Sequence, residues 1–276
     1  MAHPFLQETL LPELPHLGFV RVLAHGLLQP WVQSYWMARA TGLPGTGITE
    51  NLYPDGGVSL TFDLVEPVSP LTDISLTQQK HSRTFRGSVD SVGIRFYPGG
   101  AFGLLNIPIG ELDDTRYDAA EFVLPGLEQV QQQLRTVRDP LPRFAVLDSW
   151  LLGIARRREP SPGLIQHVVP ELLQEDNRLQ AIVQQTGVSR RTLERQFQLE
   201  TGLSPGRLKT LLRVRKARYL IKAHPELSLT EIAYACGFYD QAHFSRQFAD
   251  ITGHKPGAYR RRERDRRDAA SGLFPS

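Results

Sequence analysis

One pattern occurs twice in the C-terminal part of the sequence, and this repeat restricts the folds open to the chain more than any other feature. Residues 182–187 read IVQQTG and align with residues 232–237, which read IAYACG. Residues 193–197 read LERQF and align with residues 244–248, which read FSRQF. The offset is 50 residues for the first pair and 51 for the second, so one residue has been added at the turn between them. A repeat of this kind indicates one structural unit used twice.

The first copy is predicted to form a helix, a turn and a second helix. We expect helices over 178–185 and 190–200, with Gly187 at the turn between them. Ser189 is placed to cap the second helix, because its hydroxyl accepts a hydrogen bond from an amide that has no partner within the helix. A helix-turn-helix unit is a device with which proteins read DNA.

The second copy has the same organisation with different caps. Ser228 and Glu231 lie three residues apart and have the pattern of a capping box at the start of the first helix. Gly237 marks the turn, and Asp240 is expected to cap a second helix that runs to Thr252. The C-terminal part is therefore predicted to be all-α, with two DNA-reading units side by side.

In each copy the second helix carries an apolar stripe and a polar stripe. Leu193 with Phe197, and Phe244 with Phe248, lie four residues apart and are expected to pack inward. The polar stripes offer side chains that pair with base edges: arginine with guanine, glutamate with cytosine, and glutamine with adenine. The candidate base-reading residues are Arg191, Glu194, Arg195, Gln198, Gln241, His243 and Arg246. A solvated polar face is the alternative for either helix.

The second copy resembles the signature of the AraC/XylS-type bacterial transcription regulators. The resemblance rests on LTEIA at 229–233, CGF at 236–238, FSRQF at 244–248, and Gly253, Pro256 and Tyr259. It extends over about residues 172–262 and implies two helix-turn-helix units joined by a long helix, here 204–223. It also implies that both recognition helices enter adjacent major-groove segments on one face of the DNA. Ala242 stands where a longer polar side chain is common, which puts base reading at that position in doubt.

Basic side chains between and after the two recognition helices are candidates for contacts with DNA phosphates, which position a protein without reading sequence. These candidates are Lys209, Arg213, Arg215, Lys216 and Arg260, with Arg218, Arg261 and Arg262 as further members. Residues 1–170 contain 13 Lys and Arg against 17 Asp and Glu, whereas residues 171–276 contain 19 against 12. A basic half beside an acidic half indicates nucleic-acid binding at one end. Solvated surface charge is the alternative for each basic residue.

The N-terminal part, residues 1–160, is predicted to be a β-rich barrel or sandwich-like domain with a helical connector. Alternating apolar and polar residues at 58–64 and 92–96 predict strands, and glycine and proline lie close to both. The expected fold class is therefore α+β with two domains.

Residues after about 118 have helical spacing of apolar side chains. The stripes at 124–134 and 141–154 predict the two connector helices, and they also motivate a possible homodimer. The segment 156–163 reads RRREPSPG and is expected to link this domain to the DNA-binding domain at 161–276.

The N-terminal domain has an implied role but no implied ligand. In AraC-type regulators this domain commonly binds an effector, dimerises, or does both, and the segment 93–100 resembles a subgroup whose N-terminal domain is poorly characterised. The candidate effector-pocket residues are Tyr53, Phe62, Arg95 and Phe96, with Trp36 and Phe102 as further aromatic members. Arg95 would offer charge to an acidic effector. The alternative is that the aromatic side chains form the core and Arg95 lies at the surface.

No catalytic residue, metal ligand or cofactor is expected, and the chain is not interpreted as an enzyme. The histidines of residues 1–170 lack the spacing of a metal site, and the single cysteine, Cys236, is interpreted as a packing residue. Residues 202–206 match Gly-x-Ser-x-Gly, but a nucleophile elbow follows a strand, so Ser204 is interpreted as the cap of the connecting helix. Two alternatives stay open: an enzyme or repair domain fused to a DNA-binding module, and a regulator without a ligand.

The sequence thus predicts a cytoplasmic, nucleoid-associated transcription regulator that binds double-stranded DNA with sequence specificity. A signal-peptide pattern and a stretch of about 20 apolar residues are both missing, so no membrane contact is expected. A small-molecule effector, RNA polymerase and a second copy of the chain are the other candidate partners.

Overall fold

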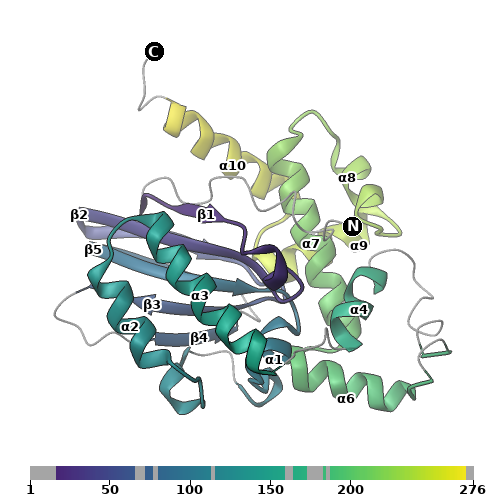
Figure 1. The fold of residues 1–276 in the computed structure, drawn as a ribbon. Coiled ribbons are helices and arrows are strands. Elements are labelled where there is room, and N and C mark those ends of the chain that lie inside the picture. Colours follow the sequence, from purple (N-terminus) through teal and green to yellow (C-terminus); the bar gives the residue numbers. More distant parts are fainter. Residues whose placement is uncertain are drawn as a thin grey trace.

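The computed structural model describes residues 17–65, 72–76, 80–112, 116–158, 164–172, 183–184 and 187–271 (Figure 1). An antiparallel sheet with helices packed on it forms the N-terminal half, and the C-terminal half is helical. The predicted two-domain α+β fold class is confirmed. No helix in these ranges is both long and apolar enough to cross a lipid bilayer.

Six strands form one antiparallel sheet in the order β1-β2-β5-β3-β4-β6. Their bounds are β1 Val20–Val22, β2 Val32–Leu52, β3 Val58–Asp63, β4 Thr72–Leu76, β5 His81–Phe96 and β6 Arg116–Asp118. The predicted strands at 58–64 and 92–96 correspond to β3 and to the end of β5. Within the described residues the second layer consists of helices, so the β-rich domain is a covered single sheet rather than a sandwich of two sheets.

Strand β2 is longer than its composition suggests. Residues 42–47 read GLPGTG, which is typical of a turn, yet β2 is paired with β5 on both sides of this segment. The register shifts between Ala40 and Leu43 and again between Leu43 and Ile48. Gly47 has a φ of +82°, which glycine adopts without strain. Irregularities of this type let a long strand bend while its pairing continues.

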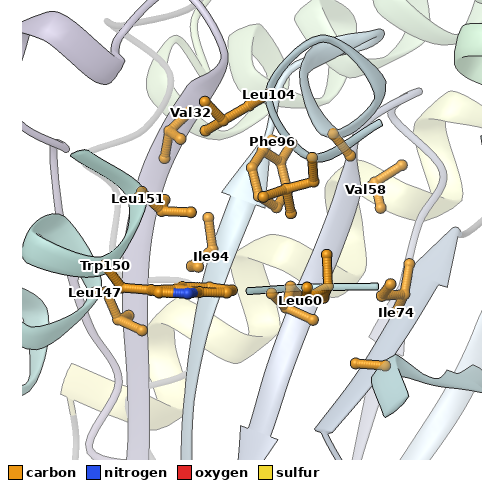
Figure 2. Packing of buried hydrophobic residues seen from close by; sticks show 14 of the residues in the cluster. Val32, Val58, Leu60, Ile74, Ile94, Phe96, Leu104, Leu147, Trp150 and Leu151 are labelled. Carbon is orange, nitrogen blue, oxygen red and sulfur yellow. The ribbon is translucent and has the colours of Figure 1, made fainter. Parts of the chain in front are cut away.

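Two helices, α2 (Leu127–Thr136) and α3 (Pro140–Arg158), cover one face of the sheet (Figure 1). Figure 2 shows Trp150 and Leu151 of α3 directed toward Ile94 of β5, within the buried cluster between the helices and the sheet. Burial of these apolar side chains is the main favourable contribution to the folding of this half.

The two apolar stripes that motivated a homodimer are buried in this core. The stripe at 124–134 and the second stripe from Phe144 to Ile154 pack against the sheet, whereas Leu141 is exposed. Packing within one chain therefore accounts for their helical spacing. The prediction that a linker starts at residue 156 was wrong, because α3 continues to Arg158 and includes the three arginines at 156–158. The rest of that linker, 159–163, lies outside the described residues.

The C-terminal half consists of helices around a second core. Their bounds are α4 Leu164–Leu172, α6 Arg190–Thr201, α7 Pro205–Ala223, α8 Leu229–Ala235, α9 Gln241–Thr252 and α10 Pro256–Ser271. Helix α7 is the expected connecting helix, and α6 and α9 are the expected recognition helices. The helix predicted over 178–185 lies mostly outside the described residues.

The residues predicted to face inward form the centre of this second core. Leu193, Phe197, Phe244 and Phe248 are fully buried, and the rings of Phe244 and Phe248 meet edge to face with their centroids 5.4 Å apart. Tyr97, which follows β5 in the N-terminal half, belongs to the same core. The two halves of the chain are therefore packed directly against each other.

Candidate nucleic-acid interface

Helix α6, the expected first recognition helix, begins at the predicted residue and ends at Thr201, one residue after the predicted end. The hydroxyl of Ser189 accepts a hydrogen bond from the Thr192 amide at 3.1 Å, and Gly187 in the preceding turn has a φ of +66°. Gly202 closes the helix in the left-handed conformation with a φ of +69°. The predicted N-cap and turn of the first unit are confirmed.

The second unit has the predicted capping box at the start of α8. The Ser228 hydroxyl accepts from the Glu231 amide at 3.1 Å, and the Glu231 carboxylate accepts from the Ser228 amide at 2.7 Å. Hydrogen bonds from the Ser228 hydroxyl and the Ser228 amide to the Glu231 carboxylate lower the pKa of Glu231, because they favour its ionised form. Asp240 caps α9 by accepting from the His243 amide at 2.6 Å. Local polar chemistry thus fixes where the second recognition helix starts.

The polar stripe of α6 faces solvent along its whole length. Arg191, Glu194, Arg195 and Gln198 are all exposed, while the apolar stripe on the other side of the helix is buried. Arg190 donates to the Glu194 carboxylate at 2.9 Å, but an exposed pair of this type contributes little and can open at low cost. This face is available to a DNA major groove.

The polar side chains of α9 are less accessible than those of α6, because some of them contact other residues of the same unit. Gln241 and Arg246 are exposed, but the side-chain oxygen of Gln241 accepts from the Thr230 hydroxyl at 2.9 Å. The ring of His243 is half-buried and meets the Phe238 ring edge to face, with centroids 5.7 Å apart. Ala242 is exposed and offers only a methyl group. The second stripe therefore has fewer extended polar groups than the first.

The residues predicted to contact phosphates fall into two groups. Arg215 interacts with Asp55 of the N-terminal half, and Arg260 donates to the Leu227 carbonyl oxygen at 2.8 Å, so both support the fold. Lys216, Arg213 and Lys209 lie along α7. Lys216 is exposed and donates to the Ala235 carbonyl oxygen at 2.7 Å, Arg213 lies over the Phe238 ring, and Lys209 is half-buried.

Helix α6 also packs against the N-terminal half, at two short elements of that half. These are α1 (Gly100–Leu105) and the 3-10 helix η4 (Ile109–Glu111). A Cβ atom added to Gly110 of η4 would overlap the carbonyl oxygen of Gln198, so this approach of two backbones requires glycine. The N-terminal half therefore touches the C-terminal end of the polar stripe of α6.

Glu200 is the ionisable group at this contact. Its side chain is only 2% exposed, and one carboxylate oxygen accepts from the Gln196 amide at 2.7 Å. The other oxygen has no hydrogen-bond partner and faces the backbone of Gly99. Burial raises the pKa of Glu200 despite the opposing effect of the Gln196 hydrogen bond.

A second contact between the halves joins the end of β2 and the following Tyr53 to the connecting helix α7 and to α10. The Arg218 guanidinium lies 4.0 Å from the centre of the Tyr53 ring and donates to the Tyr259 hydroxyl at 3.2 Å. Glu50 is buried and accepts from Arg266 at 2.6 Å. These contacts were not indicated by the sequence, because the partners are far apart in the chain.

The four candidate effector-pocket residues do not come together. Phe62 and Phe96 are buried in the core beneath α2 and α3, whereas Arg95 lies on the opposite face of the sheet, where it binds Asp55 and donates to the Ser59 hydroxyl at 3.0 Å. Tyr53 packs against α7 instead. Burial by itself would raise the pKa of Asp55, but the nearby guanidinium groups of Arg95, Arg215 and Arg218 and the hydrogen bond from the Gly57 amide together lower it. The structure gives these residues packing and pairing roles.

The described residues hold no group of three or more histidine, cysteine, aspartate or glutamate side chains that could bind a metal ion. Cys236 is buried, as expected for a packing residue. The Ser204 hydroxyl accepts from the Arg207 amide at 3.2 Å and Pro205 opens α7, so the interpretation of Ser204 as a helix cap is confirmed.

Two parts of the chain match described protein families. Residues 182–262 match the family described as "Helix-turn-helix domain", and residues 20–118 match the family described as "Domain of unknown function (DUF6597)". Curated relatives include the HTH-type transcriptional activator RhaS of Escherichia coli (strain SE11) and that of Shigella boydii serotype 18, each 50% identical over 68 residues. These matches cover 25% of this chain and only 24% of each relative. The similarity thus places an AraC-type helix-turn-helix domain in the C-terminal half.

Solved structures of two regulators are similar to the chain at low identity. A probable AraC family transcriptional regulator from Rhodopseudomonas palustris CGA009 is 25% identical, covers 36% of this chain and 93% of its own, and has a TM-score of 0.33. ToxT from Vibrio cholerae is 14% identical, covers 82% of this chain and 97% of its own, and has a TM-score of 0.43.

Proposed function

We propose that this chain, whose C-terminal half contains an AraC-type helix-turn-helix domain, is a sequence-specific transcription regulator that binds double-stranded DNA. In this proposal α6 and α9 enter adjacent major-groove segments on one face of the duplex. The same proposal assigns the protein to the cytoplasm, at the nucleoid.

The observation that carries the proposal is the exposed polar stripe of α6, held on a helix whose two ends are capped. Arg191 and Arg195 are exposed on the side of the helix away from the core, and a guanidinium group can donate two hydrogen bonds to the edge of guanine. Capping and packing fix the helix backbone before binding, so only the side chains remain to be ordered on DNA.

The connecting helix gives the two units a suitable separation. Helix α7 has 19 residues and is therefore about 28 Å long. Successive major-groove segments on one face of DNA lie roughly 34 Å apart. The length of α7 is thus of the right order to hold α6 and α9 at neighbouring grooves of one duplex.

The direct test is selection of duplexes from a random pool by the full-length protein, followed by fluorescence anisotropy at physiological salt. We expect the selected duplex to bind at least 10³-fold more tightly than random sequence, as specific regulators do. Equal affinity for selected and random duplexes would contradict sequence-specific regulation.

The N-terminal half is proposed to control this activity, either through a small-molecule effector or through assembly. Its contacts with α6 and α7 support such control, because a change in the sheet domain would reach α6 through Gly110 and the connecting helix α7 through Tyr53. Screening metabolites for a shift in the melting temperature of the full chain tests the effector, since a ligand of the folded state raises this temperature.

RNA polymerase and a second copy of the chain are further proposed partners. The homodimer no longer rests on the apolar stripes, which are buried in the core. Mass photometry of the full chain, alone and with the selected duplex, tests the dimer. Binding of purified RNA polymerase to the protein on that duplex tests the other partner.

A further inference from the structure

Two tyrosine side chains are exposed in the second helix-turn-helix unit, at positions to which the sequence motif gives no role. Tyr234 in α8 is 62% exposed, and Tyr239, in the turn before α9, is 88% exposed. They are the only strongly exposed aromatic side chains among the residues that the structure describes, and they lie five positions apart. Exposed apolar and aromatic surface beyond isolated side chains commonly marks a binding site.

The backbone that carries these tyrosines is held rigidly. The Gly237 amide donates to the Tyr234 carbonyl oxygen at 2.9 Å, and the Phe238 amide donates to Ala233 at 3.0 Å. Phe238 is buried, and Asp240 caps α9 directly after Tyr239. Because both neighbours of Tyr239 are fixed by packing or hydrogen bonds, its phenol is held out into solvent at the tip of the recognition helix.

Two cationic side chains of α7 lie beside the same turn. Lys216 donates to the Ala235 carbonyl oxygen, next to Tyr234, and this uses one of its three N–H groups. The Arg213 guanidinium lies 5.8 Å from the centre of the Phe238 ring, next to Tyr239. The N-terminus of α9, which begins after Asp240, adds a partial positive charge to this side of the unit.

We propose that Arg213, Lys216, Tyr234 and Tyr239 form a docking surface for the sugar-phosphate backbone of DNA. We call these four residues the tyrosine–cation surface. This inference rests on the proposed function and extends it, because it adds two neutral hydrogen-bond donors to the contacts expected of the second unit. Its role is to position α9 in the groove independently of base sequence.

The chemistry of the surface favours a phosphate backbone over a protein partner. Both tyrosine side chains are largely exposed, so their hydroxyls are accessible to a DNA backbone, and tyrosine hydroxyls bind phosphate oxygens. The positive charge of Arg213 and Lys216 complements the phosphates that the phenols would bind. The weak polar stripe of α9 fits the same division of roles, since a unit with few base-reading groups depends more on backbone contacts.

The test compares Tyr239→Phe and Tyr234→Phe with the wild-type full-length protein on the selected duplex and on a random duplex. Each substitution removes only a hydroxyl from an exposed ring, so folding is unaffected. We expect Tyr239→Phe to bind both duplexes roughly tenfold more weakly, which corresponds to the loss of a hydrogen bond to a charged group. The preference for the selected duplex is expected to stay unchanged.

Salt dependence gives a second readout. Tyr239→Phe should leave the slope of log affinity against log salt unchanged, because no charge is removed, whereas Lys216→Gln should reduce this slope by about one. Tyr117→Phe serves as the matched control, since it removes a phenol hydroxyl from β6 in the N-terminal sheet, and it should bind both duplexes as the wild type does.

The outcomes separate this inference from the proposed function. Wild-type affinity of Tyr239→Phe for both duplexes would overturn the tyrosine–cation surface as a DNA contact and favour a protein partner at the same place. A loss confined to the selected duplex would overturn the backbone role, because it would indicate base reading. A wild-type protein without any preference between duplexes would instead contradict the proposed function itself.

Discussion

Arg143 is almost completely buried, at 1% exposure, and joins α3 to the sheet. It forms a two-pronged ion pair with Asp90 of β5 and donates to the Val137 carbonyl oxygen at 2.7 Å. We expect Arg143→Met to lower the free energy of unfolding by about 3–5 kcal/mol, because Asp90 keeps its charge without its partner. Urea denaturation followed by circular dichroism measures this change.

Two variants control this prediction. Arg157→Met replaces an exposed arginine of the same helix and should change stability by less than about 0.5 kcal/mol. Combining Arg143→Met with Asp90→Leu should restore part of the lost stability, since no partly buried carboxylate is then left unpaired. A double variant as unstable as the sum of its single variants would refute the ion-pair explanation.

The two recognition helices differ in the side chains that they expose, which leads to a prediction about base reading. Arg195→Ala should weaken binding to the selected duplex by about 1–3 kcal/mol and relax the preference at one base pair. We expect a smaller loss of overall specificity from Arg246→Ala, because α9 has the weaker polar stripe. Anisotropy titrations against single-base variants of the duplex measure both effects, with Arg157→Ala as the control. Uniform weakening on every duplex would assign Arg195 to the phosphate backbone.

Single residues show where inference from sequence reaches its limit. Ser189, Ser228 and Asp240 were predicted as caps because a cap depends on side chains only two or three positions away. Arg95 and Arg215 were assigned to an effector pocket and to DNA phosphates, but in the structure both interact with Asp55. The sequence does not reveal a partner that lies far along the chain.

At the scale of elements, the packing of η4 on α6 depends on one glycine. Gly110→Ala would bring a methyl group into the Gln198 carbonyl, so we expect the two elements to separate at a cost of about 1–3 kcal/mol. Gly206→Ala is the matched control, because no atom lies within 4 Å of its added Cβ and alanine favours a helix. Hydrogen exchange of α6 should rise in Gly110→Ala and not in Gly206→Ala. Unchanged exchange in both variants would show that the contact does not restrain α6.

The same interface has a predicted pH dependence. Because burial raises the pKa of Glu200, the folded protein binds the carboxyl proton of Glu200 more tightly than the unfolded chain does. Stability is then lost as the pH rises from the ordinary carboxyl range through the raised pKa. Glu200→Gln should therefore raise the melting temperature at pH 7 and have little effect at pH 4, where the native carboxyl is protonated. Glu111→Gln, an exposed change at the same interface, should show no such difference. An equal effect at both pH values would contradict the prediction.

Elements were predictable to the extent that their signals are local. The pattern of β3, the stripes of α2 and α3 and the whole helix-turn-helix of the second unit follow from residues within each element. Strand β2 was not predicted, because the glycines of 42–47 are typical of a turn and only pairing with β5 keeps the segment extended. The contact of η4 with α6 also depends on tertiary packing.

At the scale of the whole molecule, the aromatic contact at Arg218 ties the two halves together. The full chain should unfold in one calorimetric transition, since the halves share Tyr97 and the stacked pair of Tyr53 and Arg218. Tyr53→Leu removes the partly desolvated cation–π contact with Arg218. We expect the single unfolding transition to separate into two, one for each half of the chain. Leu141→Ala, an exposed change on α3, should leave a single transition. Two transitions in the wild type would show that the halves are energetically independent.

The shared packing at Tyr97 and Gly110 limits how either half of this chain can be combined with other domains. A chimera that joined the helical C-terminal half to a different N-terminal domain would have to supply an aromatic side chain for the helical core in place of Tyr97. It would also need a backbone without a side chain where η4 meets Gln198. The part of the chain that can be exchanged intact is therefore larger than the two repeated helix-turn-helix units. It also includes the segments of the N-terminal half, around Tyr97 and Gly110, that pack against the C-terminal helices.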